Sequence, residues 1–243
     1  MLIHTQILFD LKDHSVPEPI AIYPLNGDYT TMEKYGRQPP GNPGNNVSLA
    51  DGPDGKASGS YQFHGTEDSY IEFPNNAGTL DAQHSITMLC WVYISKSIFS
   101  GPLFIYYNKT NSDKFFGMFI SNAKLVAYFK GNALLHIQSE TLDSNHWHYV
   151  GASYDHKTNG LSLWINGTTV RQEIFATEWT RTTGYKAVRM GAIFLKSWHG
   201  TLKFKGRITA MQVYNISLTE QQIEAVKYVS GRGKNISCKV SVC

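Results

Sequence analysis

The chain has 243 residues, of which 42% are hydrophobic and 17% are charged, and its formal net charge is +3. This length is enough for one β-sandwich domain with a sizeable core, so a second domain is not required. The weak charge lacks the basic stripe of nucleic-acid-binding proteins, and no apolar run approaches the ~20 residues that span a bilayer.

Residues 1–18 are predicted to be a lead-in segment, closed by Pro17 and Pro19. This segment has no basic start, and Asp10 and Asp13 follow its apolar part, so it does not match a secretory signal peptide. We therefore expect either an intracellular protein or a secreted protein whose signal has been removed.

Strand-like segments separated by turn residues follow the lead-in. The first is "PIAIYPL" at 19–25, and "SYQFHG" at 60–65 and "SYIEFP" at 69–74 alternate polar and apolar residues around a turn at 66–68. Residues 35–59 are rich in Gly, Pro and Asn. That composition predicts a long loop that is too polar to pack and too rich in breakers for a helix.

Residues 85–94, "SITMLCWVYI", are the clearest predicted strand. Both of its alternating faces are apolar, which indicates either a central strand covered on both sides or a strand with one face lining a groove. Short apolar segments recur over 101–139, and two strong strands are expected at 187–194 and 204–215. This spacing is typical of an antiparallel sandwich and not of βαβ units.

Residues 145–170 contain His146, His148 and His156. Two imidazoles that point the same way on a strand, with a nearby carboxylate, are a possible zinc site. The same residues also match two strands joined by a turn at 156–159, followed by Asn166-Gly167, the preferred two-residue hairpin turn. We favour the hairpin and expect no zinc site.

One helix is predicted within 218–231, "LTEQQIEAVKYVSG". Thr219 is its expected N-cap, and Gln222, three residues later, completes a capping box. Ile223 and Val226 lie on its apolar side. Residues 19–230 therefore form the predicted domain, and the polar stretch 231–243 is a C-terminal tail.

Five Asn-x-Ser/Thr sequons exceed what chance gives in a chain of this size and favour a secreted, extracellular protein. Asn166 has the alternative explanation of the hairpin turn. The sequon asparagines are Asn46, Asn108, Asn166, Asn215 and Asn235.

The chain has three cysteines, and an odd number in a secreted protein leaves one thiol unpaired or shared with a partner. Cys90 lies within a predicted strand and is expected to be a small buried hydrophobic residue. Cys238 and Cys243 are close together in the tail, where they either form a disulfide with each other or pair with other segments.

Six segments, in this order, resemble the laminin G-like (LamG-like, concanavalin A-like) jelly-roll family, which is related to the pentraxins. The resemblance covers about residues 19–228. It implies an all-β sandwich of two antiparallel sheets with a short C-terminal helix, and an extracellular adhesion or recognition module more than an enzyme. The segments are "IAIYPLNGDYT", "GPDGKASGSYQFHGTEDSYIEFPN", "HSITMLCWVYI", "HWHYVGASYDHKTNGLSLWINGTTV", "AVRMGA" and "FKGRITAMQVYNISLTEQQIEAV".

The fold that the resemblance implies hosts lectins, protein-binding modules and glycan hydrolases, so function must be argued from sites. A glycosidase needs two carboxylates close together, and the family's hydrolases carry a Glu-x-Asp-x-x-Glu strand that is not found in this sequence. The Gly-x-Ser-x-Gly motif of serine hydrolases is also missing. We therefore expect no enzymatic activity, with glycoside hydrolysis as the remote alternative.

The resemblance also implies a structural calcium ion, because related domains hold one with loop carboxylates and carbonyls. The matching positions are Asp28 and Asp68. The sequence departs from the family pattern at His64, where the usual residue is Asp, and at Thr209-Ala210, where Asp-Glu is frequent. Calcium is thus an expectation, with the alternative that both aspartates are turn residues.

Lectins stack sugar rings on exposed aromatic side chains and bind their hydroxyls with polar groups. The chosen candidates for such contacts are Trp198, His199, Trp179, Tyr106 and Tyr107. Trp91 and Tyr93 are further aromatic candidates, with the alternative that Trp91 and Trp147 belong to the core, because both match buried tryptophans of the family.

The predicted function is lectin-like or adhesive binding of a glycan by an extracellular module. The alternative is a protein ligand bound at the rim or loops, with Tyr106, Tyr107 and residues 35–59 as the contact surface. Oligomerisation is compatible with either function.

Overall fold

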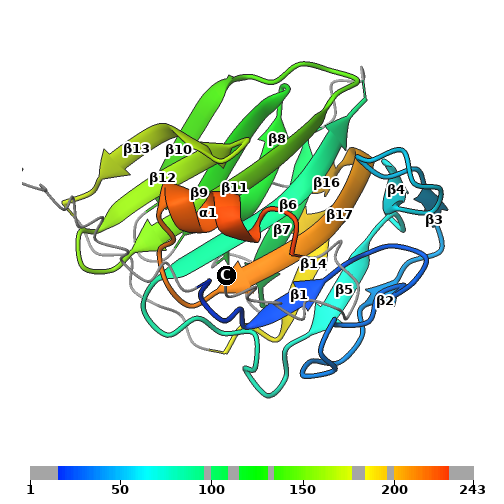
Figure 1. Ribbon diagram of the computed structural model, residues 1–243, viewed down its shortest axis with the longest axis horizontal. Coiled ribbons are helices and arrows are strands. Elements are labelled where there is room, and N and C mark those ends of the chain that lie inside the picture. The colour runs from blue at the N-terminus through cyan, green and yellow to red at the C-terminus, as the bar shows by residue number, and fades with distance from the viewer. Residues whose placement is uncertain are drawn as a thin grey trace, which may run out of the picture.

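The computed structural model describes residues 16–95, 100–108, 115–130, 134–176, 184–195 and 200–229. These residues form two antiparallel sheets packed face to face, a separate two-stranded ribbon and one helix (Figure 1). The predicted all-β, two-sheet sandwich with a short C-terminal helix is confirmed. In the described part of the chain, no helix has the length and apolarity needed to cross a membrane.

The first sheet has eight strands and is the one that faces the viewer in Figure 1. Its order is β13, β12, β11, β6, β17, β4 and β3, with β1 paired to β17 as well. The bounds are β13 (Thr168–Ile174), β12 (Gly160–Ile165), β11 (Trp147–Asp155), β6 (Ile86–Ile94), β17 (Lys205–Tyr214), β4 (Ser60–His64), β3 (Val47–Ala50) and β1 (Ala21–Tyr23).

The second sheet has seven strands in the order β10, β9, β8, β7, β14, β5 and β2. The bounds are β10 (Leu134–Thr141), β9 (Lys124–Lys130), β8 (Phe115–Ser121), β7 (Gly101–Tyr107), β14 (Ala187–Met190), β5 (Ile71–Pro74) and β2 (Asn42–Pro43). The ribbon consists of β15 (Ala192–Leu195) and β16 (Gly200–Lys203).

The strand β6 lies in the middle of the first sheet, between β11 and β17. Its residues Met88, Cys90 and Val92 are buried in the main core between the sheets. On the opposite face, Leu89 is buried in a second cluster beneath the helix, whereas Trp91 is only half-buried. Both alternatives predicted for 85–94 therefore hold, each for a different part of the strand.

The helix α1 (Glu220–Val226) lies over the outer face of the first sheet (Figure 1). Thr219 accepts a hydrogen bond from the backbone N–H of Gln222, and the Gln222 side chain accepts one from the N–H of Thr219, so the predicted capping box is confirmed. Ile223 and Val226 are buried against Leu89 and Trp164 of the sheet.

The predicted hairpin at 145–170 is confirmed. β11 pairs with β12, and β12 pairs with β13 across Asn166-Gly167, whose φ angles of 54° and 94° are those of a tight hairpin turn. His148 is buried, and its Nε2 lies 2.9 Å from the carbonyl oxygen of Asp143. The ring of His156 lies beside His84, with their centroids 5.3 Å apart.

The prediction of an unpaired loop at 35–59 is wrong in part. Residues 42–43 form β2, which pairs with β5, and residues 47–50 form β3, which pairs with β4. Both are edge strands of their sheets. An edge strand needs a partner on one side only and tolerates Pro, so a polar, proline-rich segment can occupy it.

Candidate functional site

The face of the first sheet that points away from the second sheet carries a group of aromatic residues. Trp147 lies opposite Tyr93 in the pairing of β11 with β6, and Tyr149 lies opposite Trp91. Residues directly opposite each other in a sheet project from the same face, so these four rings share one surface. α1 covers Tyr149, and Trp91, Tyr93 and Trp147 stay half-buried beyond the end of the helix.

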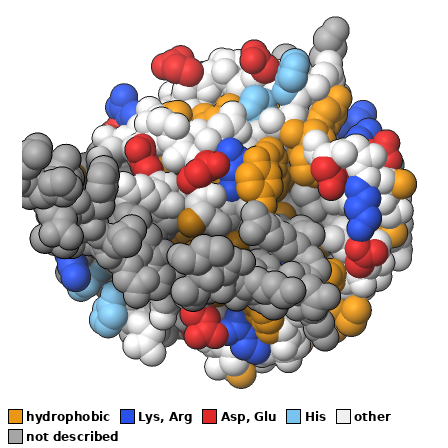
Figure 2. Space-filling model, viewed as in Figure 1, with side chains coloured by type: hydrophobic (Ala, Val, Ile, Leu, Met, Phe, Trp, Pro, Cys, Tyr) orange, Lys and Arg blue, Asp and Glu red, His pale blue; other side chains and the backbone are white. Residues whose placement is uncertain are grey.

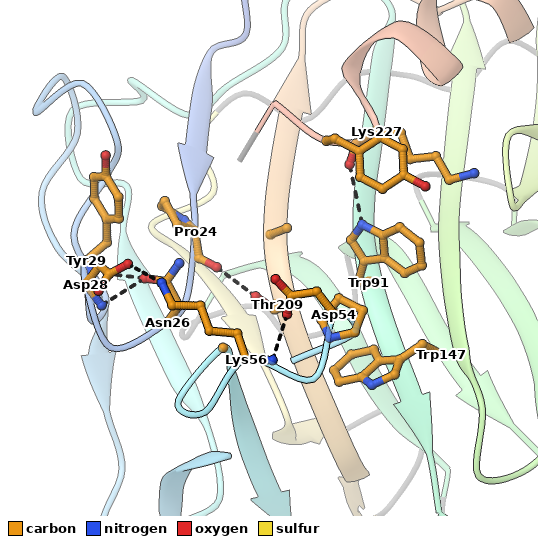
Figure 3. Close-up of a pocket in the computed structure, with 14 residues that line it drawn as sticks. Pro24, Asn26, Asp28, Tyr29, Asp54, Lys56, Trp91, Trp147, Thr209 and Lys227 are labelled. Atoms are coloured by element: carbon orange, nitrogen blue, oxygen red, sulfur yellow. Dashed lines mark hydrogen bonds and ion pairs between the residues drawn. The ribbon is translucent and has the colours of Figure 1, made fainter. Parts of the chain in front are cut away.

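A groove with a volume of ≈ 630 Å³ lies on this surface. Figure 3 shows Trp91 and Trp147 one below the other on the side of α1, and Asp28 and Lys56 on the opposite side. Figure 2, in the view of Figure 1, shows exposed hydrophobic side chains beside basic and acidic ones. The lining residues are Pro24, Asn26, Asp28, Tyr29, Pro53, Asp54, Lys56, Gly59, Trp91, Trp147, Thr209, Ala210, Lys227 and Tyr228.

A β-bulge in β17 forms part of the floor of the groove. Thr209 lies opposite Trp91 and Gln212 opposite Leu89, so three steps along β17 match two along β6. Ala210 has a φ of 57°, in the left-handed region that disfavours residues with a Cβ atom. The Thr209 hydroxyl and the Ala210 N–H both donate to the Pro24 carbonyl oxygen, at 2.8 and 3.0 Å, so the bulge holds the neighbouring loop.

Two loops build the wall opposite the tryptophans. The Asn26 Oδ1 accepts hydrogen bonds from the N–H groups of Asp28 and Tyr29, which closes a turn. The Asp54 Oδ1 accepts one from the N–H of Lys56. The Lys56 Nζ lies 2.6 Å from the Asp28 Oδ2 and ties the loops together. Because Asp28 accepts this hydrogen bond, it raises the pKa of the Lys56 ammonium.

The residues after α1 build the other wall. The Trp91 Nε1–H donates to the Lys227 carbonyl oxygen at 3.4 Å, and the Trp91 and Tyr228 ring centroids are 6.1 Å apart. The Lys227 Nζ lies 5.9 Å from the Trp91 ring centroid and 5.6 Å from that of Tyr228. The Lys34 ammonium donates to the Val229 carbonyl oxygen and holds this segment at the helix end.

The predicted ligand-binding residues are not the ones that the structure brings together. Trp198, His199 and Trp179 lie outside the described residues. Tyr106 and Tyr107 are buried, and their hydroxyls donate to the Leu80 carbonyl oxygen and to Glu72. The prediction that these two tyrosines are exposed is wrong, because β7 is covered on both faces.

The alternative that Trp91 and Trp147 belong to the core is wrong, because both are only half-buried. Both line the groove instead. One signal in the sequence pointed to this, since a strand at 85–94 with two apolar faces also fits a strand that lines a groove. The strand pattern does not predict where the helix that covers this face ends.

The aspartates expected to bind calcium are engaged in other contacts. Asp28 pairs with Lys56, and the Asp68 Oδ1 accepts a hydrogen bond from the Thr66 hydroxyl at 2.7 Å. The described residues bring no three His, Cys, Asp or Glu side chains together as a metal site, so a calcium ion there would need backbone carbonyl ligands and the release of Asp28 from Lys56. Calcium binding stays a prediction of the resemblance, which melting temperatures measured with calcium and with a chelator can test.

The remaining predicted positions are the sequon asparagines, the cysteines and the lead-in. Asn166 and Asn215 are exposed, and the Asn46 side-chain amide donates to the Thr66 hydroxyl at 2.8 Å. Cys90 is buried, as predicted, and burial raises the pKa of its thiol to about 12. Asn235, Cys238, Cys243 and most of the lead-in lie outside the described residues.

A family model described as "Concanavalin A-like lectin/glucanases superfamily" matches residues 64–224. A comparison with curated proteins finds no match. Many solved structures are similar to this chain. These similarities support the fold.

Domain 4 of AbnA, a GH43 extracellular arabinanase from Geobacillus stearothermophilus in complex with arabinotriose, has a TM-score of 0.68 and 16% identity, over 86% of this chain and 98% of that one. The binding domain of botulinum neurotoxin serotype G has a TM-score of 0.67 and 14% identity, over 87% of this chain and 51% of that one. The CBM40 of the Ruminococcus gnavus IT-sialidase, bound to α2,3-sialyllactose, has a TM-score of 0.56 and 22% identity, over 68% and 97%.

Proposed function

Since the chain belongs to the concanavalin A-like lectin/glucanase superfamily, we propose that it is an extracellular, non-enzymatic recognition module that binds glycans in the groove on its first sheet. The observation that carries this proposal is the pair of half-buried indoles, Trp91 and Trp147, beside loops rich in polar groups.

The groove combines the two kinds of contact that a sugar needs. The faces of a pyranose ring that carry C–H groups stack on aromatic rings, and its hydroxyls exchange hydrogen bonds with amide, carboxylate and hydroxyl groups. Trp91 and Trp147 supply the rings, and Asn26, Asp54 and Thr209 supply polar atoms along the lining. A site of ≈ 630 Å³ is within the usual range for a bound small molecule.

The printed descriptions of similar structures agree with a glycan ligand. The arabinanase domain is in complex with arabinotriose, and the sialidase CBM40 is bound to α2,3-sialyllactose. A similar toxin binding domain is in complex with a protein, rat synaptotagmin II. A protein ligand is therefore the alternative function, and glycan binding is the favoured one because the indoles line a groove and not a flat surface.

A glycan array followed by titration calorimetry tests the proposal. Trp147→Ala is expected to weaken binding of the best glycan about tenfold or more, the effect of losing roughly 1.5–3 kcal/mol of apolar burial. The control is Phe194→Ala, which removes an exposed aromatic ring, 60% accessible, on the ribbon strand β15.

The control variant should bind like the unmodified protein and keep its melting temperature. Equal affinities for Trp147→Ala and the unmodified protein would contradict the proposed groove. Hydrolysis of any bound glycan, lost on replacing one carboxylate, would contradict the proposed absence of catalysis.

A further inference from the structure

The arrangement of rings in the groove bears on the length of the ligand. Trp91 and Trp147 lie on neighbouring strands and are offset by two residues, because the partner of Trp91 is Tyr149 and the partner of Trp147 is Tyr93. Such diagonal neighbours lie about 7–8 Å apart between their Cα atoms. Two large ring surfaces at this offset give stacking places for more than one sugar of a single chain.

Each tryptophan also has an aromatic partner that supports it from the side. The Trp147 and Tyr93 ring centroids are 5.6 Å apart, and Trp91 lies 5.3 Å from Tyr149 and 6.1 Å from Tyr228. These contacts restrict the rotamers of both indoles before a ligand arrives. Less side-chain entropy is then lost when a ligand stacks on them, which favours binding.

The charges of the groove bear on the chemistry of the ligand. Among the described lining residues, the cations are Lys56 and Lys227 and the anions are Asp28 and Asp54. Lys56 is paired with Asp28 at 2.6 Å. The Lys227 side chain is only 13% exposed, and its Nζ lies 3.4 Å from Glu224. Both ammonium groups are therefore already engaged.

The remaining charge at the groove is the carboxylate of Asp54. Its Oδ1 accepts the N–H of Lys56 within its own turn, and its charge also acts on the Lys56 ammonium, although the ion pair of that ammonium is with Asp28. Arg207, two residues before Thr209 on β17, has its guanidinium 5.1 Å from the Tyr93 ring centroid and donates to Gln62 and to the Asp51 carbonyl oxygen. The Asp54 carboxylate therefore accepts hydrogen bonds from a ligand and repels a second anion placed beside it.

Building on the proposed function, we infer that the groove binds a neutral oligosaccharide that spans both tryptophans, and that it discriminates against chains bearing a carboxylate or sulfate. A neutral sugar donates its hydroxyls to Asp54 and Asn26 and leaves the ion pair of Lys56 with Asp28 intact. An acidic sugar at the same place meets the Asp54 charge or has to break that ion pair.

The test compares matched neutral and acidic oligosaccharides by titration calorimetry with the whole chain. The probes are an unmodified oligosaccharide series from one to six sugars and the sialylated and sulfated forms of the same chains. We expect affinity for neutral chains to rise at least tenfold from one sugar to three. The matched acidic chains should bind at least tenfold more weakly.

Two further measurements identify the cause. Asp54→Asn keeps an oxygen that can accept the Lys56 N–H. It should reduce the ratio of the affinities for neutral and acidic chains at least threefold. Neutral binding should change less than twofold between low and high salt, because no ion pair forms with the ligand. An unchanged ratio of the two affinities in Asp54→Asn would overturn the role of this carboxylate.

The outcomes separate the two proposals. Tighter binding of the acidic chains, or affinity that does not depend on chain length, would overturn the inference and leave glycan binding in the groove standing. Absence of binding to every chain would overturn both.

Discussion

At the scale of single residues, Ala210 is the least ordinary position of the groove. It adopts a φ of 57° within a β-bulge and is 4% exposed, and its N–H donates to the Pro24 carbonyl oxygen. A left-handed conformation costs a residue with a Cβ atom roughly 1–2 kcal/mol relative to glycine. Bulges are frequent beside functional sites, where they redirect side chains, and this bulge brings both Thr209 and Ala210 to the floor of the groove.

Replacements at Ala210 test this conformation. Ala210→Gly removes the unfavourable Cβ contact in the folded state but raises the conformational entropy of the unfolded chain. These effects oppose each other, so the free energy of unfolding should rise by less than about 1 kcal/mol. Ala210→Val should lower it by about 2 kcal/mol or more, because a branched side chain is a genuine outlier there. Urea denaturation measures both. Equal stability of the glycine and valine variants would contradict the strained bulge.

At the scale of elements, α1 determines which part of the first sheet is a binding surface. The seven-residue helix buries Leu89, Tyr149 and Trp164 of the sheet. It ends at Val226, and the next residues, Lys227 and Tyr228, already line the groove. A helix this short is not stable by itself, so its caps and its buried side chains hold the groove wall in place.

Removing the N-cap of α1 should therefore loosen the wall. Thr219→Ala deletes the hydroxyl that accepts the Gln222 N–H, and we expect a loss of about 1 kcal/mol in the free energy of unfolding. Gln221→Ala, a change at an exposed position of the same helix, should stay within about 0.5 kcal/mol. Chemical denaturation compares the two variants. A loss as large in Gln221→Ala would show that the cap is not the cause.

At the scale of the whole molecule, the core contains several buried groups that ionise in alkali. Burial raises the pKa of Cys90 to about 12 and raises the pKa values of Tyr23, Tyr106, Tyr149 and Tyr214. In the unfolded chain, a thiol ionises near pH 8.5 and a phenol near pH 10, as unperturbed groups do.

This difference predicts loss of stability in alkali. A group whose pKa is higher in the folded state contributes its full stabilisation below the unfolded pKa and loses it as the pH rises towards the folded pKa. The melting temperature should therefore be level between about pH 7 and pH 8.5 and fall progressively above about pH 9. Calorimetric scans across this range check it. A melting temperature that stays constant up to pH 11 would contradict the burial of these groups.

Much of the architecture could be predicted from sequence because it rests on local patterns. The alternation of 85–94, the Asn166-Gly167 turn and the capping box at Thr219 each depend on a few adjacent residues, and the structure contains all three. The strands at 42–43 and 47–50 could not be predicted in this way. Their pairing depends on β5 and β4, and not on any preference of their own residues.

The groove was harder to predict from the sequence than the fold. Its aromatic floor depends on the point at which α1 stops covering the sheet, and its polar wall depends on contacts between loops 28 residues apart, such as Lys56 with Asp28. Tyr106 and Tyr107 show the reverse error. They looked like exposed rings in an aromatic segment, but the neighbouring strands and the ribbon bury them.

The groove is assembled from six separate parts of the chain, which range from Pro24 near one end of the described residues to Tyr228 near the other. A site of this kind does not exist in any fragment, because the local structure of one part cannot supply the others. Recognition and folding are therefore thermodynamically coupled. A ligand at a hundred times its dissociation constant adds about 2.7 kcal/mol to the stability of the folded state. An occupied groove therefore stabilises the first and last described segments of the domain together with the central strands.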